Sequence, residues 1–183
     1  MHQMRQFLLP VWEILETLAI ALISIFIIYT FIAQPFIVQG ASMEPNFENG
    51  DYILIDEITY RFREPQRGEV IIFHNPRNEN EFYIKRVIGL PGEEVSISGD
   101  EIKVNDKVLQ EDYLPVAGSV VGARVFDLAP NEFFVMGDNR PQSFDSRSWG
   151  ALKRDEIIGT VRLRFWPPGK LQIFRQAISY TFS

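Results

Sequence analysis

The sequence predicts a mainly β protein, in which an N-terminal transmembrane helix is followed by an antiparallel twisted sheet or open barrel. Two observations predict this architecture. Residues 17–33 carry no charge and are dominated by Ile, Leu, Phe and Ala. Beyond residue 50, short runs of β-forming residues alternate with close turns, a pattern typical of antiparallel sheets. We therefore expect a tail and a helix in residues 1–34 and a β-rich domain in residues 35–183, with a β-meander inserted around 93–130.

The N-terminal helix is predicted to begin at Pro10, whose fixed φ suits a first helical turn, and Glu13 and Glu16 follow where carboxylates favour the helix dipole. At about 1.5 Å per residue, a helix from Pro10 to Ala33 is about 36 Å long, enough to cross a hydrocarbon core of about 30 Å. Two alternatives are weaker. A cleaved signal peptide would not have Pro35 where cleavage should occur. A buried core helix is rarely apolar on every face.

Strands are predicted wherever β-branched or aromatic residues alternate with polar residues between turn signals. The dipeptides Asn49-Gly50 and Gly99-Asp100 are two of these signals. Because the runs are short and the turns are close together, neighbouring strands should pair in antiparallel fashion. The predicted strands are residues 51–55, 69–73, 82–88, 95–98, 101–104, 107–109, 131–136 and 157–166.

The composition excludes several classes of function. The formal net charge is −6 and no cluster of Lys and Arg occurs, which argues against nucleic acid as a partner. The chain has no cysteine and only two histidines, His2 and His74. Disulfides, a thiolate metal site, a cysteine nucleophile and an H-E-x-x-H zinc motif are therefore excluded. We expect chemistry without a metal or another cofactor.

A candidate nucleophile lies just beyond the apolar run. Residues 36–39 form a short extended segment that ends in a Gly-Ala-Ser elbow, and the hydroxyl of Ser42 would lie close to a bilayer surface. A serine becomes a nucleophile only when a neighbouring base removes its proton. His74 stays open as that base. It follows a strand directly before Asn75-Pro76 with no carboxylate near it in the sequence, which favours a surface imidazole.

Lys85 is the second candidate base. Strand alternation puts Tyr83 and Lys85 on one face and Ile84 and Arg86 on the other, so one of the two cations must lie among apolar neighbours. An arginine there would stay charged, whereas a lysine can lose its proton. A lysine pKa is ordinarily about 10.4, and lowering it by about 3 toward neutral pH costs roughly 4 kcal/mol, a change that burial can supply. The competing interpretation is an ordinary strand lysine whose ammonium reaches water.

Four sequence blocks carry a family resemblance, in the family's own order. They are G-A-S-M-E-P at 40–45, R-G-E-V-I-I-F at 67–73, Y-I-K-R-V-I-G-L-P-G-E at 83–93 and G-D-N-R-P-Q-S-F-D-S-R at 137–147. The chain resembles the bacterial and organellar type I signal peptidases, membrane-anchored endopeptidases that remove signal peptides from exported proteins. With the apolar helix, the resemblance covers nearly the whole chain, and the ordered set of blocks is highly specific.

The resemblance implies a Ser-Lys dyad in which Ser42 is the nucleophile and Lys85 is the general base. It also implies hydrolysis without a metal or cofactor, after Ala-x-Ala sites, because shallow apolar pockets accept only small side chains. The remaining positions that match the family's site are Ser143, which holds the lysine amine; Asp145 and Arg147, a structural ion pair; Asp138 and Arg140, which shape the same turn; and Phe36, Val38 and Ile84, which line the pockets.

The sequence departs from the family pattern at the oxyanion site. The backbone N–H of Ser42 is expected to bind the oxyanion, but many relatives add a serine hydroxyl where this chain has Gly40. Since one such donor is worth about 3 to 4 kcal/mol, the backbone around Gly40 or a water is expected to replace it. Gln142 stands where asparagine is usual, and Asn46 where threonine is usual.

The expected partners are preproteins that carry signal peptides and a lipid bilayer. The resemblance implies a single-pass protein of the plasma membrane, or of a thylakoid membrane, with its catalytic domain on the side away from the cytosol. Two alternative functions were weighed on the sequence. A self-cleaving repressor-type Ser-Lys domain would need a DNA-binding helical module, which the apolar N-terminus argues against. A membrane-tethered β domain that binds partners without chemistry would treat Ser42 and Lys85 as ordinary turn and strand residues.

Overall fold

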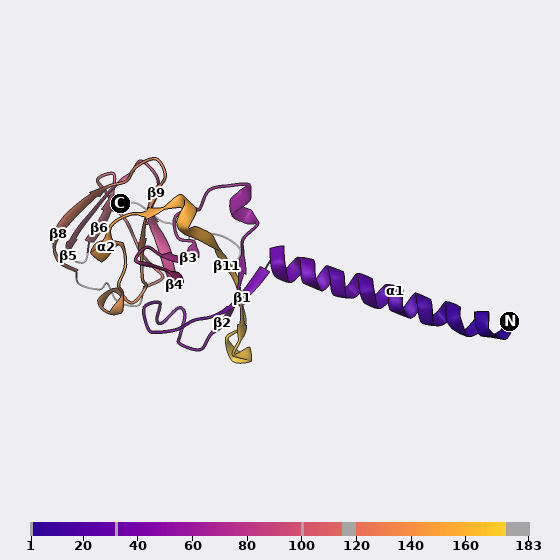
Figure 1. Cartoon of the computed structure of the whole chain (residues 1–183). Helices are drawn as coiled ribbons and strands as arrows, with labels where there is room; N and C mark the ends of the chain where they lie inside the picture. The colour runs from indigo at the N-terminus through magenta and orange to yellow at the C-terminus, as the bar shows by residue number, and fades with distance from the viewer. Residues whose placement is uncertain (1, 32, 100, 115–119, 175–183) are drawn as a thin grey trace.

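Two antiparallel sheets build the domain, and a long helix extends away from it (Figure 1). The structure is a computed structural model, and it describes residues 2–31, 33–99, 101–114 and 120–174. The predicted mainly β, antiparallel architecture is confirmed. The division of the chain at residue 34 into an anchor and a catalytic domain stays a prediction.

The larger sheet contains the strands that will form the site. All of its pairings are antiparallel. Its order is β1 (Ala33–Ile37), β2 (Tyr52–Asp56), β11 (Ile157–Trp166), β3 (Val70–Asn75), β4 (Asn78–Gly89), β9 (Glu132–Met136) and β10 (Leu152–Lys153), and β12 (Gln172–Ile173) pairs with β11.

The smaller sheet lies within the segment for which the sequence predicts a meander. Its order is β7 (Lys107–Val108), β6 (Glu101–Val104), β5 (Glu94–Gly99) and β8 (Val120–Asp127). The helices are α1 (His2–Phe31) and α2 (Ser146–Trp149), and single 3-10 turns occur at η1 (Thr59–Arg61), η2 (Arg140–Gln142), η3 (Arg154–Glu156) and η4 (Pro168–Lys170).

Strand β4 is the element that joins the hydrophobic cores. The buried apolar residues form three clusters, and β4 contributes Ile84 to the first, Val87 to the third and Ile88 to the second. Because apolar layers cover both faces of this strand, the usual alternation of buried and exposed residues is lost, and every residue from 84 to 89 is buried. Polar residues in this stretch are therefore held deep inside the domain.

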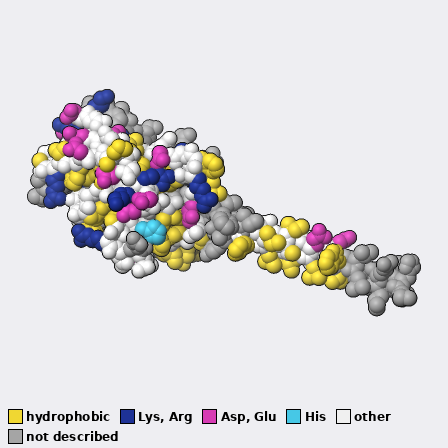
Figure 2. Space-filling model, turned by 45° about the horizontal axis from the view of Figure 1, so that its top comes forward, with side chains coloured by type: hydrophobic (Ala, Val, Ile, Leu, Met, Phe, Trp, Pro, Cys, Tyr) yellow, Lys and Arg dark blue, Asp and Glu magenta, His cyan; other side chains and the backbone are white. Residues whose placement is uncertain are grey.

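Helix α1 extends from the domain into open space (Figure 1). Its apolar side chains between residues 11 and 26 are exposed, as Trp12 at 68% and Phe26 at 63% illustrate. Figure 2 shows these side chains as hydrophobic atoms along the described part of α1. Among the described residues, no helix reaches the length and hydropathy that a bilayer crossing requires, so the predicted transmembrane span is not confirmed. The side chains of residues 27–33, the last part of that prediction, lie outside the described residues.

Candidate active site

Ser42 is presented by a turn that is fixed from two directions. Before it, the Val38 N–H donates to Asp51 O at 2.9 Å, and Gly40 adopts a φ of 85°, a conformation that favours glycine. After it, Met43 and Phe47 are buried at 1% and 0% exposure and anchor the turn in the first core cluster. The apolar anchors therefore lie beneath the turn, while the half-buried Ser42 remains at its surface.

Asn139 fastens the same turn from the other side of the cleft. Its backbone N–H donates to Ser42 O, and its side-chain amide donates to Ala41 O, both at 3.0 Å. Gly137 approaches so closely that an added Cβ would lie 2.4 Å from Ser42 O. Asn139 was not singled out from the sequence, where it resembles any asparagine of a polar turn. Its two bonds fix the carbonyl groups on either side of the nucleophile.

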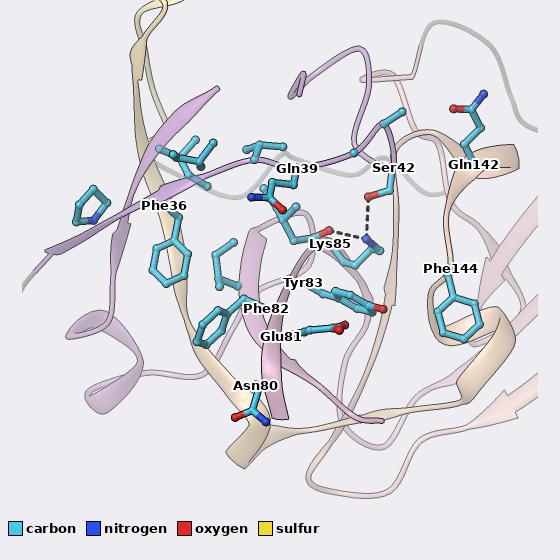
Figure 3. A pocket seen from close by; sticks show the side chains of 18 residues that line it. Phe36, Gln39, Ser42, Asn80, Glu81, Phe82, Tyr83, Lys85, Gln142 and Phe144 are labelled. Atoms are coloured by element: carbon cyan, nitrogen blue, oxygen red, sulfur yellow. Dashed lines mark hydrogen bonds between the residues drawn. The ribbon is translucent and has the colours of Figure 1, made fainter. Parts of the chain in front are cut away.

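Lys85 reaches the nucleophile from the buried strand β4. Its Nζ lies 2.9 Å from Ser42 Oγ and donates to Ile84 O at 2.8 Å (Figure 3). The side chain crosses the Tyr83 ring, with Nζ 5.3 Å from the ring centroid. Ile71 of β3 is its register partner. The residue is only 4% exposed, and its contacts among the described residues are two neutral oxygens and a ring.

This environment lowers the pKa of Lys85 to about 8. Burial is the largest cause, because removing an ammonium from water disfavours its charged form. The carboxylates of Asp145 and Asp138 act in the opposite direction and raise the pKa, whereas the Arg147 cation lowers it. At pH 7 about one tenth of such amines are neutral. A neutral amine at 2.9 Å can accept the proton of the Ser42 hydroxyl.

Ser143 lies beside the dyad without joining it. Its Oγ is buried and has no hydrogen-bond partner among the described residues. The structure therefore does not show the hydrogen bond from Lys85 that the resemblance implies for Ser143. Ser143 is nonetheless close to the site, because a Cβ added to Gly137 would lie 2.3 Å from its Oγ.

The ion pair expected between Asp145 and Arg147 is present. Arg147 Nε and Nη2 each donate to the carboxylate at 2.8 Å, and Asp145 is fully buried. The carboxylate also accepts the Gly137 N–H at 3.0 Å, and Arg147 donates to Arg140 O at 2.7 Å. This pair therefore holds the two ends of the turn that contains Ser143.

Asp138 and Arg140 lie in one turn but have different partners. Asp138 pairs with Arg86 through bonds of 2.8 and 2.6 Å, and Arg140 pairs with Glu111. Arg86 also packs over the Tyr113 ring, 4.2 Å from its centroid. Nothing in the sequence indicates these distant partners. Strand alternation predicted at least one buried cation on β4, and the structure buries both.

An open cleft of about 770 Å³ lies in front of the dyad (Figure 3). The three predicted pocket residues, Phe36, Val38 and Ile84, line this cleft, and Phe36 packs edge-on against Phe82. His74, the base that the sequence left open, packs at a tilt against Phe82, with ring centroids 5.1 Å apart, and is not among the residues that line the cleft. The cleft is lined by Pro35, Phe36, Ile37, Val38, Gln39, Gly40, Ala41, Ser42, Ile53, Ile72, Asn80, Glu81, Phe82, Tyr83, Ile84, Lys85, Gln142 and Phe144.

The oxyanion prediction needs a correction at Gly40. The Gly40 N–H already donates to Asn49 Oδ1 at 2.9 Å, so it is not available to a developing oxyanion. The Ser42 N–H, in contrast, has no acceptor among the described residues. Of the two predicted backbone donors, only Ser42 remains available, and Asn49 is an additional residue that fixes the elbow.

An antiparallel β fold, an open cleft and a serine hydroxyl in contact with a buried amine together define a class of protein, the peptidases that use serine as a nucleophile. Comparison with known families is more specific, because residues 11–166 match the family described as signal peptidase, peptidase S26. The chain therefore belongs to the signal peptidase family and is a serine peptidase.

Two relatives found by sequence agree with this assignment. A probable signal peptidase I-2 of Synechocystis sp. is 39% identical over 163 residues, which are 85% of this chain and 73% of that protein. Signal peptidase I of Leptolyngbya laminosa is 36% identical over 170 residues, 88% of this chain and 83% of that protein. A crystal structure of a signal peptidase I from Enterococcus faecalis V583 is 34% identical and covers 54% of this chain and 97% of its own, with a TM-score of 0.48.

Proposed function

We propose that the chain is a membrane-bound serine endopeptidase that removes signal peptides from exported preproteins after small-x-small sites. Ser42 is the nucleophile and Lys85 is the general base. The observation that carries this proposal is the 2.9 Å contact between Ser42 Oγ and a buried amine whose pKa is about 8. A base with a pKa close to the working pH combines a sufficient neutral fraction with sufficient basicity.

The reaction proceeds through an acyl-enzyme. Neutral Lys85 takes the proton of Ser42 as Oγ attacks the scissile carbonyl, and the Ser42 N–H donates to the oxyanion that forms. The lysine ammonium then gives its proton to the leaving amine, which is the new N-terminus of the mature protein. A water, deprotonated by the same amine, hydrolyses the ester and restores the hydroxyl. The Ser143 hydroxyl, whose oxygen is buried and has no hydrogen-bond partner among the described residues, is the proposed acceptor for the ammonium in these steps.

The cleft is suited to an extended peptide. β1 pairs with β2 along one edge, and β4 pairs with β9 only from Arg86 onward. Within the described chain, the edges of β1 and β4 that face the cleft therefore have no strand partner. A substrate strand can add to such edges through backbone hydrogen bonds. The apolar side chains of Phe36, Val38 and Ile84 then face alternate substrate residues and favour small ones, as an Ala-x-Ala site requires.

Membrane attachment is proposed through α1. Its exposed apolar side chains, such as Trp12, Ile14 and Phe26, have no protein surface to cover them in the described chain. Lipid would remove this surface from water. We place the catalytic domain on the side of a plasma or thylakoid membrane away from the cytosol. Co-flotation of the full chain with lipid vesicles, and its loss on deletion of residues 2–31, tests the attachment, and flotation that survives the deletion contradicts it.

Covalent labelling tests the proposed chemistry. An acylating β-lactone or penem probe should add one adduct to the intact protein in neutral detergent, and peptide mapping should locate it on Ser42. Ser42→Ala should remain unlabelled, and wild type should cleave an Ala-x-Ala peptide but not its Leu-x-Leu counterpart. Labelling of another residue, or equal cleavage of both peptides, would contradict the proposal. The matched control is Ser98→Ala, since Ser98 is exposed on β5 and does not line the cleft.

A further inference from the structure

The cleft extends to both sides of the dyad. In Figure 3 the Ser42 hydroxyl lies between Phe36 on one side and Gln142 and Phe144 on the other, and all of these residues line the cleft. A peptide whose scissile carbonyl meets Ser42 therefore contacts both walls. If the residues before the cleaved bond occupy the apolar side around Phe36, the residues after it pass Gln142 and Phe144.

On the side of Ser42 away from Phe36, two loops contact each other through Phe144 and Arg77. Phe144 is 42% exposed, and the guanidinium carbon of Arg77 lies over its ring, 5.0 Å from the centroid. Arg77 belongs to the turn between β3 and β4, and its backbone N–H donates to Asn75 Oδ1 at 2.9 Å. An arginine stacked on an aromatic ring loses little further freedom when it binds a carboxylate, because its planar fork is already oriented.

The charge of Arg77 is not neutralised by an ion pair within the described part of the chain. Glu81 of β4 carries a carboxylate that lines the cleft. Two side-chain amides donate hydrogen bonds to this carboxylate. Asn75 Nδ2 donates to Glu81 at 3.0 Å and Asn78 Nδ2 at 2.9 Å. An exposed cation therefore packs on Phe144, a residue that lines the cleft, while both oxygens of Glu81 already accept hydrogen bonds from amides.

We propose that Arg77 and Phe144 form a subsite for an acidic side chain within the first three residues after the cleaved bond. The inference rests on the proposed function and specifies its substrate class: preproteins whose mature part begins with an Asp or Glu close to the cut. The guanidinium pairs with the carboxylate, and the Phe144 ring keeps the guanidinium in place. Because the pair is exposed, its contribution is modest and is screened by salt.

Cleavage of a peptide panel tests the subsite. The peptides share one Ala-x-Ala site and carry Glu, Gln or Lys singly at each of the next three positions, and the full chain is assayed in neutral detergent. At one position, wild type should show a kcat/KM about threefold higher for Glu than for Gln, the size expected of an exposed ion pair. Arg77→Gln should bring this ratio to about one, and Arg77→Glu should reverse the preference in favour of Lys. Raising the salt to about 0.5 M should reduce the wild-type ratio toward one.

Controls separate this inference from its alternatives. Arg61→Gln removes another exposed arginine, one on η1 that, within the described chain, packs on no ring that lines the cleft, and should keep the wild-type ratio. Phe144→Leu should lower the ratio, because Arg77 loses its stacking partner. Equal Glu-to-Gln ratios of kcat/KM in wild type and Arg77→Gln overturn the subsite. The same assay is repeated on anionic lipid vesicles. An Arg77→Gln defect that is the same for all peptides and occurs only on these vesicles also overturns the subsite. Failure of wild type to cleave the Gln peptides overturns the proposed function instead.

Discussion

Lys85 and Arg86 are neighbours on β4 and are equally buried, each 4% exposed, yet their environments are opposite. Arg86 donates to both oxygens of Asp138 and, at 2.9 Å, to Gly68 O. Lys85 contacts two neutral oxygens and an aromatic ring among the described residues. One cation is therefore matched by a carboxylate at bonding distance, and the other is not.

The difference shows how one strand can hold a structural cation and a base side by side. A guanidinium stays protonated at any ordinary pH, and its bidentate carboxylate fixes it in place. Burial without such a carboxylate lowers the pKa of Lys85 to about 8, which makes its neutral form accessible. The side-chain type and its partner, rather than the depth of burial, decide which role a buried cation takes.

The largest expected effect comes from making Lys85 resemble its neighbour. Lys85→Arg keeps the positive charge but cannot release a proton, so we expect kcat/KM for an Ala-x-Ala peptide to fall about 10⁴-fold, as it should in Ser42→Ala. Steady-state cleavage in detergent measures the loss. Lys103→Arg, an exposed lysine of β6, is the control and should be fully active. An active Lys85→Arg variant would remove the lysine from the mechanism.

The next effect concerns stability rather than activity. Arg86→Met leaves the Asp138 carboxylate buried without its cation, and we expect the free energy of unfolding to fall by about 3 to 5 kcal/mol. Urea denaturation measures the change. Replacing both partners, Arg86→Met with Asp138→Leu, should recover most of it. Breaking the solvent-screened pair between Lys103 and Glu101 with Lys103→Ala should change the free energy of unfolding far less. A similar loss in the exposed and buried pairs would contradict the comparison.

Lys85→Met should act in the opposite direction to Arg86→Met. The pKa of Lys85 is about 8 in the folded chain and about 10.4 when unfolded, so below pH 8 the folded state holds a buried ammonium at a cost of about 3 kcal/mol. Between these two pKa values the unfolded chain binds the extra proton, and wild-type stability rises with pH. The variant should therefore be more stable than wild type at pH 6, with the difference lost above about pH 10.4. A pH-independent difference would exclude titration of Lys85 as its cause.

Gly137 links the dyad to its ionic support, and Gly137→Ala should disturb that link. The added Cβ would lie 2.3 Å from Ser143 Oγ and 2.4 Å from Ser42 O, so the nucleophile turn must shift. We expect kcat to fall by about 10²-fold, the cost of a misplaced reacting group. Gly169→Ala is the matched control, because nothing lies within 4 Å of its added Cβ. Equal kcat values for the two variants would show that the turn tolerates the displacement.

The smallest step, about tenfold for each pH unit, is expected in the pH dependence of the wild type. With neutral Lys85 as the proposed base, kcat/KM should rise below pH 8 and level off above it. Initial rates on one peptide between pH 5.5 and about pH 9.5 measure the profile. Activity that is highest at acidic pH would require a different proton acceptor.

The chemistry of the site was predictable because four ordered sequence blocks carry a family resemblance. The residues alone left Lys85 and His74 open as the base for Ser42, whereas the resemblance implied Lys85, whose Nζ lies 2.9 Å from Ser42 Oγ in the structure. Phe36, Val38 and Ile84 line the same cleft, as expected. The antiparallel architecture followed from period-two alternation between close turns.

The supporting contacts were not predictable, because they join ordinary residues that are distant in sequence. Asn139 donates to Ala41 across 98 positions, and Arg86 meets Asp138 across 52. Asn49 looked like a simple turn residue, but its side chain engages the Gly40 N–H and removes a predicted oxyanion donor. Side-chain types indicate which reactions are possible, whereas hydrogen-bond partners are set by how strands meet in space.

The participation of β4 in all three hydrophobic clusters has a consequence for biosynthesis. These clusters include Val135 of β9 and Val161 of β11, which the ribosome makes after Lys85. A nascent chain that ends before those residues lacks the apolar layers that strip water from the amine, so its pKa stays near that of a free lysine. We therefore expect the proposed base to become available only after the last of these core strands is in place.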